Sequence, residues 1–247
     1  MSYPTTVSEA GSALYLGDCR EILPRLPAGT VDLVVMDPPY NIARPYALTR
    51  AGGRVRSTQE AWGVWDQYAP RRYEELLRDV FRELARVLRP GGQVYCWIGA
   101  EGIGQALAAA RAAGLRYRAK LVAVKARPQP SFRERNWRSC YEECLYFAKD
   151  SAWPFHFQGQ RQMRNVLELP YEPKASRHPT EKRPAMIEPL IRVSSSRGQV
   201  VLDPFLGSGT TAVIARRLGR RYIGIERSPT YFSMARRRLA GEDPGRA

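Results

Sequence analysis

The sequence is poor in the residues from which metal sites and membrane segments are built. Its 247 residues include four cysteines and two histidines, and the cysteines form no C-x-x-C pair. That spacing is the usual signature of a zinc site, so we expect no metal. No apolar run approaches the roughly 18 residues of a membrane span, and the first residues lack the basic and apolar regions of a secretory leader. We therefore expect a cytoplasmic protein with reduced thiols and no membrane partner.

Other absences narrow the class of protein further. The sequence has no G-x-G-x-x-G fingerprint, which argues against a hydride-transferring dehydrogenase, and it has no internal repeat or low-complexity tract. Apolar residues make up 44% of the chain and charged residues 26%, as in a globular protein. The length suits one sizeable domain, so we expect residues 1–247 to form a single unit.

Acidic residues are scarce relative to basic ones. The 39 lysines and arginines exceed the 24 acidic residues and give a net charge of +15. Such an excess favours a polyanionic partner, with nucleic acid first, because basic side chains neutralise phosphates and release counterions. The alternative is that arginine abundance reflects genomic base composition and solvated faces, and charge alone leaves both interpretations open.

Periodicity predicts alternating strands and helices. The continuous apolar run 31–36 indicates a buried parallel strand, and the apolar spacing over 73–88 indicates an amphipathic helix. The series continues with a strand at 93–98, a helix at 101–114 and a strand at 115–125. A second series has a helix at 184–193, a strand at 199–202, a helix to 218, a strand at 221–226 and a helix from 229. This order predicts an α/β fold with one doubly wound, mostly parallel sheet.

Two long segments interrupt the alternation, 43–70 and 127–180. The first is rich in Arg, Gly and Trp, and the second in Pro, Arg and aromatics. Long irregular segments in a compact domain usually serve as lids or binding loops. We expect one core strand within the second segment, near 141–149.

A glycine-rich turn follows the strand 199–202. It consists of Asp203, Pro204, Phe205, Leu206, Gly207, Ser208, Gly209, Thr210 and Thr211. The helix N-terminus after the turn suits an anion, whereas the Asp203 carboxylate would repel phosphate and suits a cation. The methionine half of S-adenosylmethionine carries both charges. Glu226, at the end of the strand 221–226, suits ribose hydroxyls, although a solvated strand-end charge is the alternative.

A second motif, Asp37-Pro38-Pro39-Tyr40, follows the strand 31–36. An exocyclic amine is a poor nucleophile because its lone pair is delocalised into the ring, so two acceptors are needed to hold its N–H groups. Asp37 supplies one acceptor, the Pro38 carbonyl supplies the other, and Tyr40 can stack on a flipped base. The alternative is an ordinary strand followed by a turn with two prolines.

With both motifs, the sequence resembles the DNA amino-methyltransferases that act on adenine N6 or cytosine N4, in the group whose DPPY motif precedes the DPFLGSG motif. The resemblance extends from LYLGDCREIL through LRPGGQVYCWIG, YEECLYFAK and HPTEKRPAMIEPLI to YIGIE. It implies the Rossmann-like fold of S-adenosylmethionine-dependent methyltransferases. Aspartate at the first catalytic position resembles the adenine enzymes, whereas serine is commoner in cytosine N4 enzymes.

The resemblance also implies further cofactor contacts. Asp18 and Cys19 would flank the cofactor adenine, and His178, Thr180 and Lys182 would face its methionine end. Capping or solvation of a loop is the alternative for His178. The family usually has Lys-Pro where this sequence has Lys182-Arg183-Pro184.

Candidate DNA contacts lie in the two long segments. We expect 43–70 to be a lid, with Arg54 and Arg56 on DNA, and 127–177 to be the target-recognition region. In the latter, the residues expected on DNA are Arg133, Arg135, Trp137 and Arg138, unless the aromatics instead pack on the sheet.

The sequence therefore predicts an adenine-N6 methyltransferase that acts on double-stranded DNA by base flipping, with S-adenosylmethionine as cofactor. Cytosine N4, an RNA or protein amide and a non-enzymatic DNA-binding specificity subunit are the alternatives. We expect it at the nucleoid, and a restriction endonuclease partner and a homodimer are left open.

Overall fold

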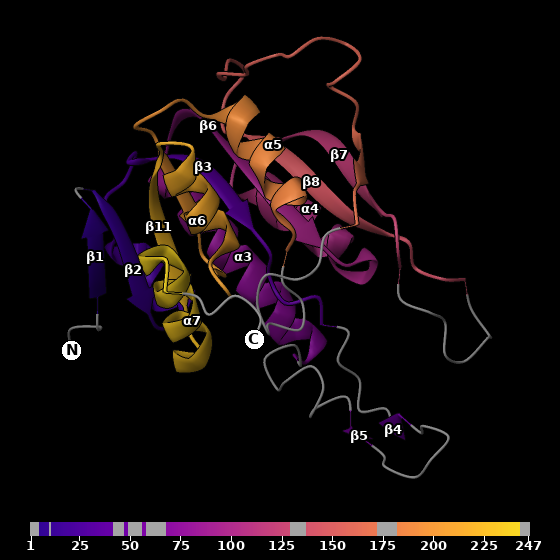
Figure 1. Ribbon diagram of the computed structural model, residues 1–247, viewed down its shortest axis with the longest axis horizontal. Coiled ribbons are helices and arrows are strands. Elements are labelled where there is room, and N and C mark those ends of the chain that lie inside the picture. Colours follow the sequence, from indigo (N-terminus) through magenta and orange to yellow (C-terminus); the bar gives the residue numbers. More distant parts are fainter. Residues whose placement is uncertain are drawn as a thin grey trace.

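The computed structural model describes residues 11–41, 68–128, 137–171 and 182–242 in full, and the backbone alone of 5–9, 47–48 and 56–57. Its centre is a nine-stranded sheet with helices on both faces (Figure 1). The α/β fold expected from the sequence is confirmed, and the two predicted series of strands share one sheet. No helix in these ranges is long and apolar enough to span a membrane.

The sheet is mostly parallel. The strands β1 and β8 run antiparallel to their neighbours, and the other seven run in one direction. From one edge to the other the order is β1 (Thr5–Glu9), β2 (Ser12–Leu16), β11 (Arg221–Glu226), β10 (Val200–Asp203), β3 (Val31–Met36), β6 (Leu88–Ile98), β8 (Tyr141–Ala148), β7 (Arg116–Lys125) and β9 (Val166–Leu169). A separate antiparallel pair joins β4 (Ala47–Leu48) to β5 (Arg56–Ser57).

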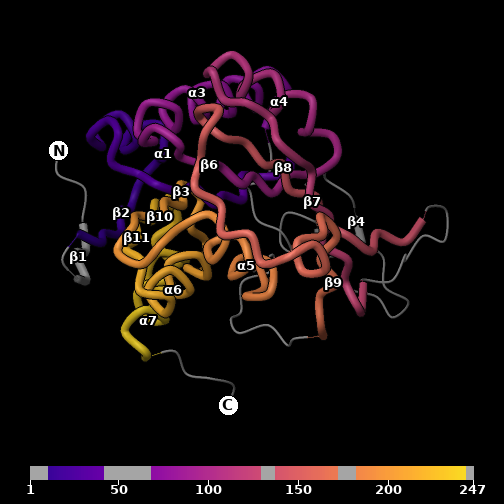
Figure 2. The backbone as a smooth tube through the Cα atoms, turned by 90° about the horizontal axis from the view of Figure 1, so that it is seen from above, coloured from indigo at the N-terminus to yellow at the C-terminus, as the bar shows by residue number. Residues whose placement is uncertain are grey.

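The helices form two layers, one on each face of the sheet (Figure 2). One layer holds α1 (Cys19–Ile22), the 3-10 turns η1 (Leu23–Arg25) and η3 (Ala100–Gly102), α3 (Pro70–Val87) and α4 (Ile103–Ala112). The other holds α5 (Pro184–Ser194), α6 (Thr210–Arg217) and α7 (Pro229–Ala240). Parallel strands with helices on both faces are buried on both sides, which explains their continuous apolar sequences.

The strand β3 shows this two-sided burial directly. Val34 and Met36 belong to the core beneath α3 and α4, whereas Leu33 and Val35 belong to the core beneath α5 and α6. The run of apolar residues at 31–36 therefore serves both cores. It also fixes Asp37, the next residue, at the carboxyl edge of the sheet.

Three strands of the nine-stranded sheet, β1, β2 and β9, were not expected from the sequence, and neither was the separate pair of β4 and β5. The hairpin of β1 and β2 extends the sheet at one edge, and β9 pairs with β7 at the other. The hairpin and β9 lie at the two edges of the sheet, where side chains are only partly buried. The strands β2 and β9 therefore lack the continuous apolar run of a central strand. The strand β6 also begins at Leu88, directly after α3, rather than at residue 93.

Candidate active site

Four acidic residues stand side by side at the carboxyl edge of the sheet. Adjacent parallel strands β2, β11, β10 and β3 are followed by or end in Asp18, Glu226, Asp203 and Asp37, respectively. The pairing of Val201 with Leu33 and of Leu202 with Val34 brings Asp203 and Asp37 to neighbouring strand ends. Residues of both predicted motifs therefore line one pocket, together with Lys182.

The glycine-rich turn is held in place by two of these carboxylates. Asp203 Oδ1 accepts a hydrogen bond from Phe205 N at 3.0 Å, and Glu226 Oε2 accepts one from Gly207 N at 2.8 Å. The other Glu226 oxygen accepts from Ser228 N at 2.7 Å, where α7 begins. Glu226 therefore shapes the turn, a function that its place at a strand end did not reveal.

Glycine is required at position 209 because the backbone there is left-handed, with φ of 88°. A Cβ atom at this position would lie 2.8 Å from the Cβ of Ala235 in α7. The helix α6 begins at the next residue, Thr210, so its first N–H groups face the pocket. An anionic group suits this end of the pocket.

The acidic side of the turn suits a cation. Burial raises the pKa of Asp203 to about 7, against the hydrogen bonds from Thr211 and Phe205, and the charges of Asp37 and Glu226 raise it further. Among the described residues, no lysine or arginine forms a salt bridge with Asp203. A positively charged ligand beside Asp203 would replace the lost solvation and restore the ionised form.

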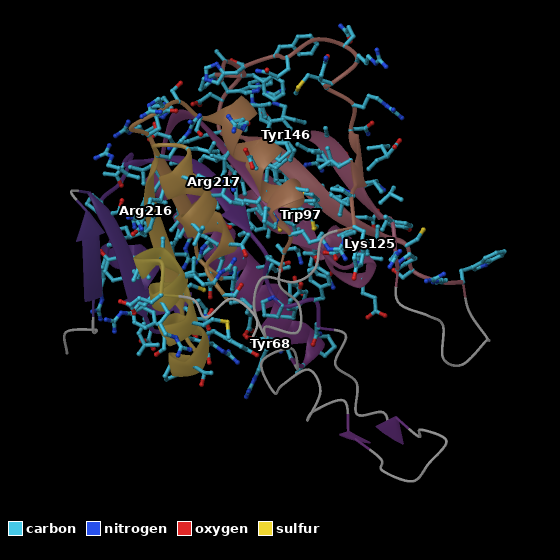
Figure 3. The ribbon with its side chains drawn as sticks, viewed as in Figure 1. Tyr68, Trp97, Lys125, Tyr146, Arg216 and Arg217 are labelled. Atoms are coloured by element: carbon cyan, nitrogen blue, oxygen red, sulfur yellow. The ribbon has the colours of Figure 1, made fainter. Side chains whose placement is uncertain are left out.

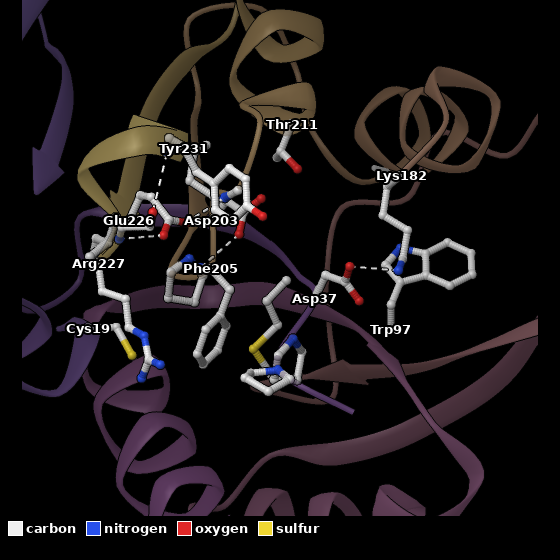
Figure 4. Close-up of a pocket in the computed structure, with 18 of the residues that line it drawn as sticks. Cys19, Asp37, Trp97, Lys182, Asp203, Phe205, Thr211, Glu226, Arg227 and Tyr231 are labelled. Atoms are coloured by element: carbon white, nitrogen blue, oxygen red, sulfur yellow. Dashed lines mark hydrogen bonds and ion pairs between the residues drawn. The ribbon is translucent and has the colours of Figure 1, made fainter. Parts of the chain in front are cut away.

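At the other end of the pocket, Asp18 caps α1 and accepts from Arg20 N at 2.9 Å. Burial disfavours its charge, but the hydrogen bonds and charge of Arg20 lower its pKa overall. Cys19 is buried beside it, and burial raises the pKa of this thiol to about 12. A neutral thiol, with the Phe205 ring nearby in Figure 4, makes this end of the pocket suited to a flat apolar group.

The Asp37 carboxylate is paired with a lysine from the opposite layer. Lys182 Nζ lies 2.6 Å from Asp37 Oδ2, and 4.9 Å from the centre of the Tyr40 ring (Figure 4). Burial raises the pKa of Asp37 to about 6, and the Lys182 charge limits the rise. The carboxylate is thus ionised at neutral pH, and Asp37 belongs to the lining of the pocket.

Two polar atoms of this region lack a partner within the described part of the chain. Asp37 Oδ1 and Trp97 Nε1 are both buried, and no described residue forms a hydrogen bond of normal geometry with either. Buried polar atoms are nearly always paired in proteins, so unpaired atoms lining a pocket indicate a ligand. The acceptor at Asp37 requires a donor such as an amine.

Comparison with known proteins fits this geometry. Residues 31–237 match the family model of the N6/N4 DNA methylases. The Type II methyltransferase M2.DpnII of Streptococcus pneumoniae is 31% identical over 245 residues, which cover 92% of this chain and 88% of the relative. The chain belongs to the N6/N4 family of DNA methylases.

Solved structures of similar proteins include cofactor complexes. The M1.HpyAVI complex with SAM superposes with a TM-score of 0.70 at 25% identity, covering 92% of this chain and 98% of that one. TTHA0409 of Thermus thermophilus, complexed with S-adenosyl-L-methionine, gives 0.64 at 27% identity, with coverages of 94% and 96%. The methylase is a DNA methyltransferase of a family that uses S-adenosylmethionine. This membership sets aside the RNA, protein and non-enzymatic alternatives.

The structure brings together most, but not all, of the predicted site residues of the methylase. The pocket is lined by Asp18, Cys19, the catalytic motif, Lys182, Glu226 and every residue of the glycine-rich turn except Gly209. Lys182 lies at the catalytic motif, because Arg183 and Pro184 begin α5 and leave the preceding lysine pointing to Asp37. His178 and Thr180 lie outside the described residues.

The predicted DNA contacts are described only in part. Arg54, Arg133 and Arg135 lie outside the described residues, as does the side chain of Arg56. Trp137 is 96% exposed, so this aromatic residue does not pack on the sheet. Arg138 donates to the carbonyl of Pro128. These contacts stay predictions.

Sequence reasoning missed a set of residues that link the pocket to its surroundings. Asn41 Oδ1 accepts from Tyr68 N at 2.7 Å, and the Tyr68 hydroxyl accepts from Arg227 at 3.0 Å. Both ends of the segment 42–67 are thereby held beside the pocket, which Tyr68 and Arg227 line. No local motif marks these residues. The same is true of Glu142, which contacts Lys182.

Proposed function

We propose that this methylase transfers a methyl group to the N6 amino group of adenine in double-stranded DNA, after the base has flipped into the pocket. The observation that carries the proposal is the buried Oδ1 of Asp37, which has no hydrogen-bond partner among the described residues and belongs to the same pocket as the glycine-rich turn. An acceptor in that position suits the N–H of a planar amine. S-adenosylmethionine, when bound, supplies the methyl group on a positively charged sulfur.

The described residues fit this cofactor along its length. Asp203 suits the methionine ammonium, and the N-terminus of α6 suits the carboxylate. Each carboxylate oxygen of Glu226 accepts one hydrogen bond from a backbone N–H group. Each oxygen can accept a further hydrogen bond, from a ribose hydroxyl. Asp18 and Cys19 suit the adenine ring. His178 and Thr180, as predicted contacts of the methionine end, complete the proposed set.

In the proposed mechanism, the chain contributes orientation and polarisation. Asp37 Oδ1 and the Pro38 carbonyl accept the two N–H groups, which draws the nitrogen lone pair out of the ring, and the Tyr40 ring stacks on the base. S-adenosylmethionine would supply the methyl carbon to this lone pair and would keep the electrons of the broken carbon–sulfur bond, so the chain's own residues need only hold the amine in line. One N–H proton then leaves to Asp37, whose pKa of about 6 lets it pass the proton to water.

Adenine is favoured over cytosine because aspartate occupies the first position of the catalytic motif. The alternative target is cytosine N4, since the two acceptors suit any planar exocyclic amine. The two long segments 43–70 and 127–177 stay as the proposed lid and target-recognition region. A restriction endonuclease partner and a homodimer remain predictions from the sequence.

The test is to express the protein in a host without DNA methylation and to analyse nucleosides by mass spectrometry. We expect N6-methyladenine, with sequencing that maps it to one recognition site. The control is D37N, which keeps the size of the side chain but removes its charge, and it should bind cofactor while losing at least about 100-fold in kcat. N4-methylcytosine would overturn the choice of base, and full activity of D37N would remove Asp37 from its role.

A further inference from the structure

The ammonium of Lys182 lies between two carboxylates from different strands. Its Nζ is 2.6 Å from Asp37 Oδ2 and 3.0 Å from Glu142 Oε2. The side chains are largely buried, with Lys182 11% exposed and Glu142 19% exposed. Lys182 therefore connects the catalytic motif to a residue that lies outside both predicted site motifs.

The sheet explains why Glu142 reaches this position. The strand β8 runs antiparallel to β6, so its first residues lie at the same edge as the carboxyl ends of β3 and β6. Lys125, at the carboxyl end of β7 (Figure 3), lies at this edge too and pairs with Glu142 at 2.9 Å. The order Lys125, Glu142, Lys182, Asp37 alternates in sign, so the charges of the row sum to zero.

The same carboxylate also contacts the proposed base-stacking ring. The Tyr40 hydroxyl donates to Glu142 Oε2 at 3.3 Å. At the Cβ end of Tyr40, Gly99, which follows β6, leaves so little room that an added Cβ would lie 3.3 Å from Cβ, Cγ and Cδ2 of Tyr40. Glu142 and Gly99 thus fix the ring between them.

The contact between Lys182 and Glu142 restricts which oxygen of Asp37 the lysine covers. A lysine held by Asp37 alone is free to cover both carboxylate oxygens and compete with an incoming amine. With Glu142 on its other side, Lys182 stays at Oδ2, and Oδ1 remains unpartnered within the described chain. A buried ion pair seldom adds stability over an apolar pair of similar size, so stability alone does not account for this arrangement.

We propose that Glu142 is a positioning residue for methyl transfer, which acts through Lys182 to leave one oxygen of Asp37 able to accept a hydrogen bond from the target amine. The inference rests on the role proposed for Asp37. Glu142 itself touches neither the cofactor nor the reacting nitrogen. Its removal should therefore change kcat and leave cofactor affinity unaltered.

The charge of Glu142 also affects the pH at which Asp37 ionises. The charged and titratable groups around Asp37 are Lys182 before α5, Glu142 and Cys144 on β8, Cys96 on β6, Asp203 on β10, and Tyr40 in its own loop. Burial raises the Asp37 pKa, Lys182 lowers it, and Glu142 raises it as a like charge. Loss of the Glu142 charge should therefore lower the Asp37 pKa, and activity should persist to lower pH.

The experiment compares E142Q with E143Q in the full-length protein. Glu143 is the adjacent residue, and it pairs with Lys120 at 2.8 Å rather than with Lys182, so E143Q removes the same charge elsewhere. The measurements are single-turnover methyl transfer to DNA across pH, the Kd of S-adenosylmethionine, and the thermal unfolding midpoint. Wild type and D37N are included to test the role of Asp37 independently.

For E142Q we expect a loss of at least about tenfold in kcat, with the Kd of S-adenosylmethionine within about twofold of wild type. The acid limb of its pH profile should move to lower pH by on the order of half a unit. E143Q should match wild type in all three. In a K182M background, adding E142Q should lower kcat little further, because a residue that acts through Lys182 loses its effect when Lys182 is absent.

Three results would overturn the proposal. The first is that E142Q has the same rate and pH profile as E143Q. The second is that the unfolding midpoint and cofactor affinity of E142Q fall together with its rate, and the third is that the effects of E142Q and K182M on kcat are fully additive. If D37N is inactive while E142Q resembles wild type, only the positioning role of Glu142 fails. If D37N is active, the proposed function fails first.

Discussion

At the scale of single residues, the pocket contains a buried carboxylate, Asp203, with which no described lysine or arginine forms a salt bridge. Asp203 is 5% exposed, and the other acidic residues of the edge add to the cost of its charge. A buried carboxylate of this kind favours the binding of a cationic ligand. It also makes ligand binding depend on pH, because the ligand must find the carboxylate ionised.

Binding of S-adenosylmethionine should therefore weaken as pH falls. Burial raises the pKa of Asp203 to about 7 in the free protein, so below that pH the carboxyl is neutral and must lose a proton before it can pair with an ammonium. Well below pH 7 the Kd should rise by about tenfold per pH unit. Calorimetry between about pH 5.5 and pH 7.5 measures this slope, in a range where an α-amino group stays protonated.

The control for this slope is D203N, which keeps the size of the side chain. The variant should bind more weakly than wild type at pH 7.5, and its Kd should change little with pH through this range. A wild-type slope that persists unchanged in D203N would show that another group, such as Glu226, is the one that titrates.

At the scale of elements, the turn after β10 is tied to the packing of α6 on α7. Replacing Gly209 by alanine should destabilise the fold, because the left-handed backbone disfavours a side chain and the new Cβ would meet Ala235 at 2.8 Å. We expect a loss of about 2–4 kcal/mol in the free energy of unfolding, measured in urea. The affinity for S-adenosylmethionine should fall as well, because the turn lines the pocket.

Gly104 offers a matched control. It lies inside α4, where an added Cβ would have no atom within 4 Å. Alanine there should leave the free energy of unfolding unchanged or raise it by about 0.5–1 kcal/mol, because alanine favours a helix. Equal losses for the two variants would mean that the backbone and contact at Gly209 are not what requires glycine.

The elements also show what the sequence could and could not predict. The central strands were predictable because burial on both faces leaves continuous apolar runs, and the motifs with Asp37 and Asp203 were predictable because each is local to one turn. The partners of these residues were not. Glu142 reaches Lys182 only because β8 runs antiparallel beside β6, and no feature of YEECLYFAK distinguishes Glu142, which pairs with Lys182, from Glu143, which pairs with Lys120.

At the scale of the whole molecule, acidic and basic residues serve different ligands. The net charge is +15, yet the ends of β2, β11, β10 and β3 carry four acidic residues in a row. The acidic row suits a small cationic ligand and would repel phosphate. DNA must therefore be held by basic residues away from this row, and the affinity of the protein for DNA should depend on where those residues lie rather than on net charge alone.

This division predicts different salt dependence for two double variants that each remove two positive charges. Arg54 and Arg56 belong to the segment that starts and ends beside the pocket, at Asn41 and Tyr68. Arg111 and Arg116 are exposed at the opposite edge, where α4 ends and β7 begins. If Arg54 and Arg56 contact phosphates, R54A/R56A should reduce the slope of log Kobs against log salt by about 1.8, as expected for two contacts. Fluorescence anisotropy with a duplex at several salt concentrations measures that slope.

The control variant, R111A/R116A, should keep the slope of wild type. An equal reduction of the slope in both variants would mean that net charge, not the position of the arginines, determines DNA binding.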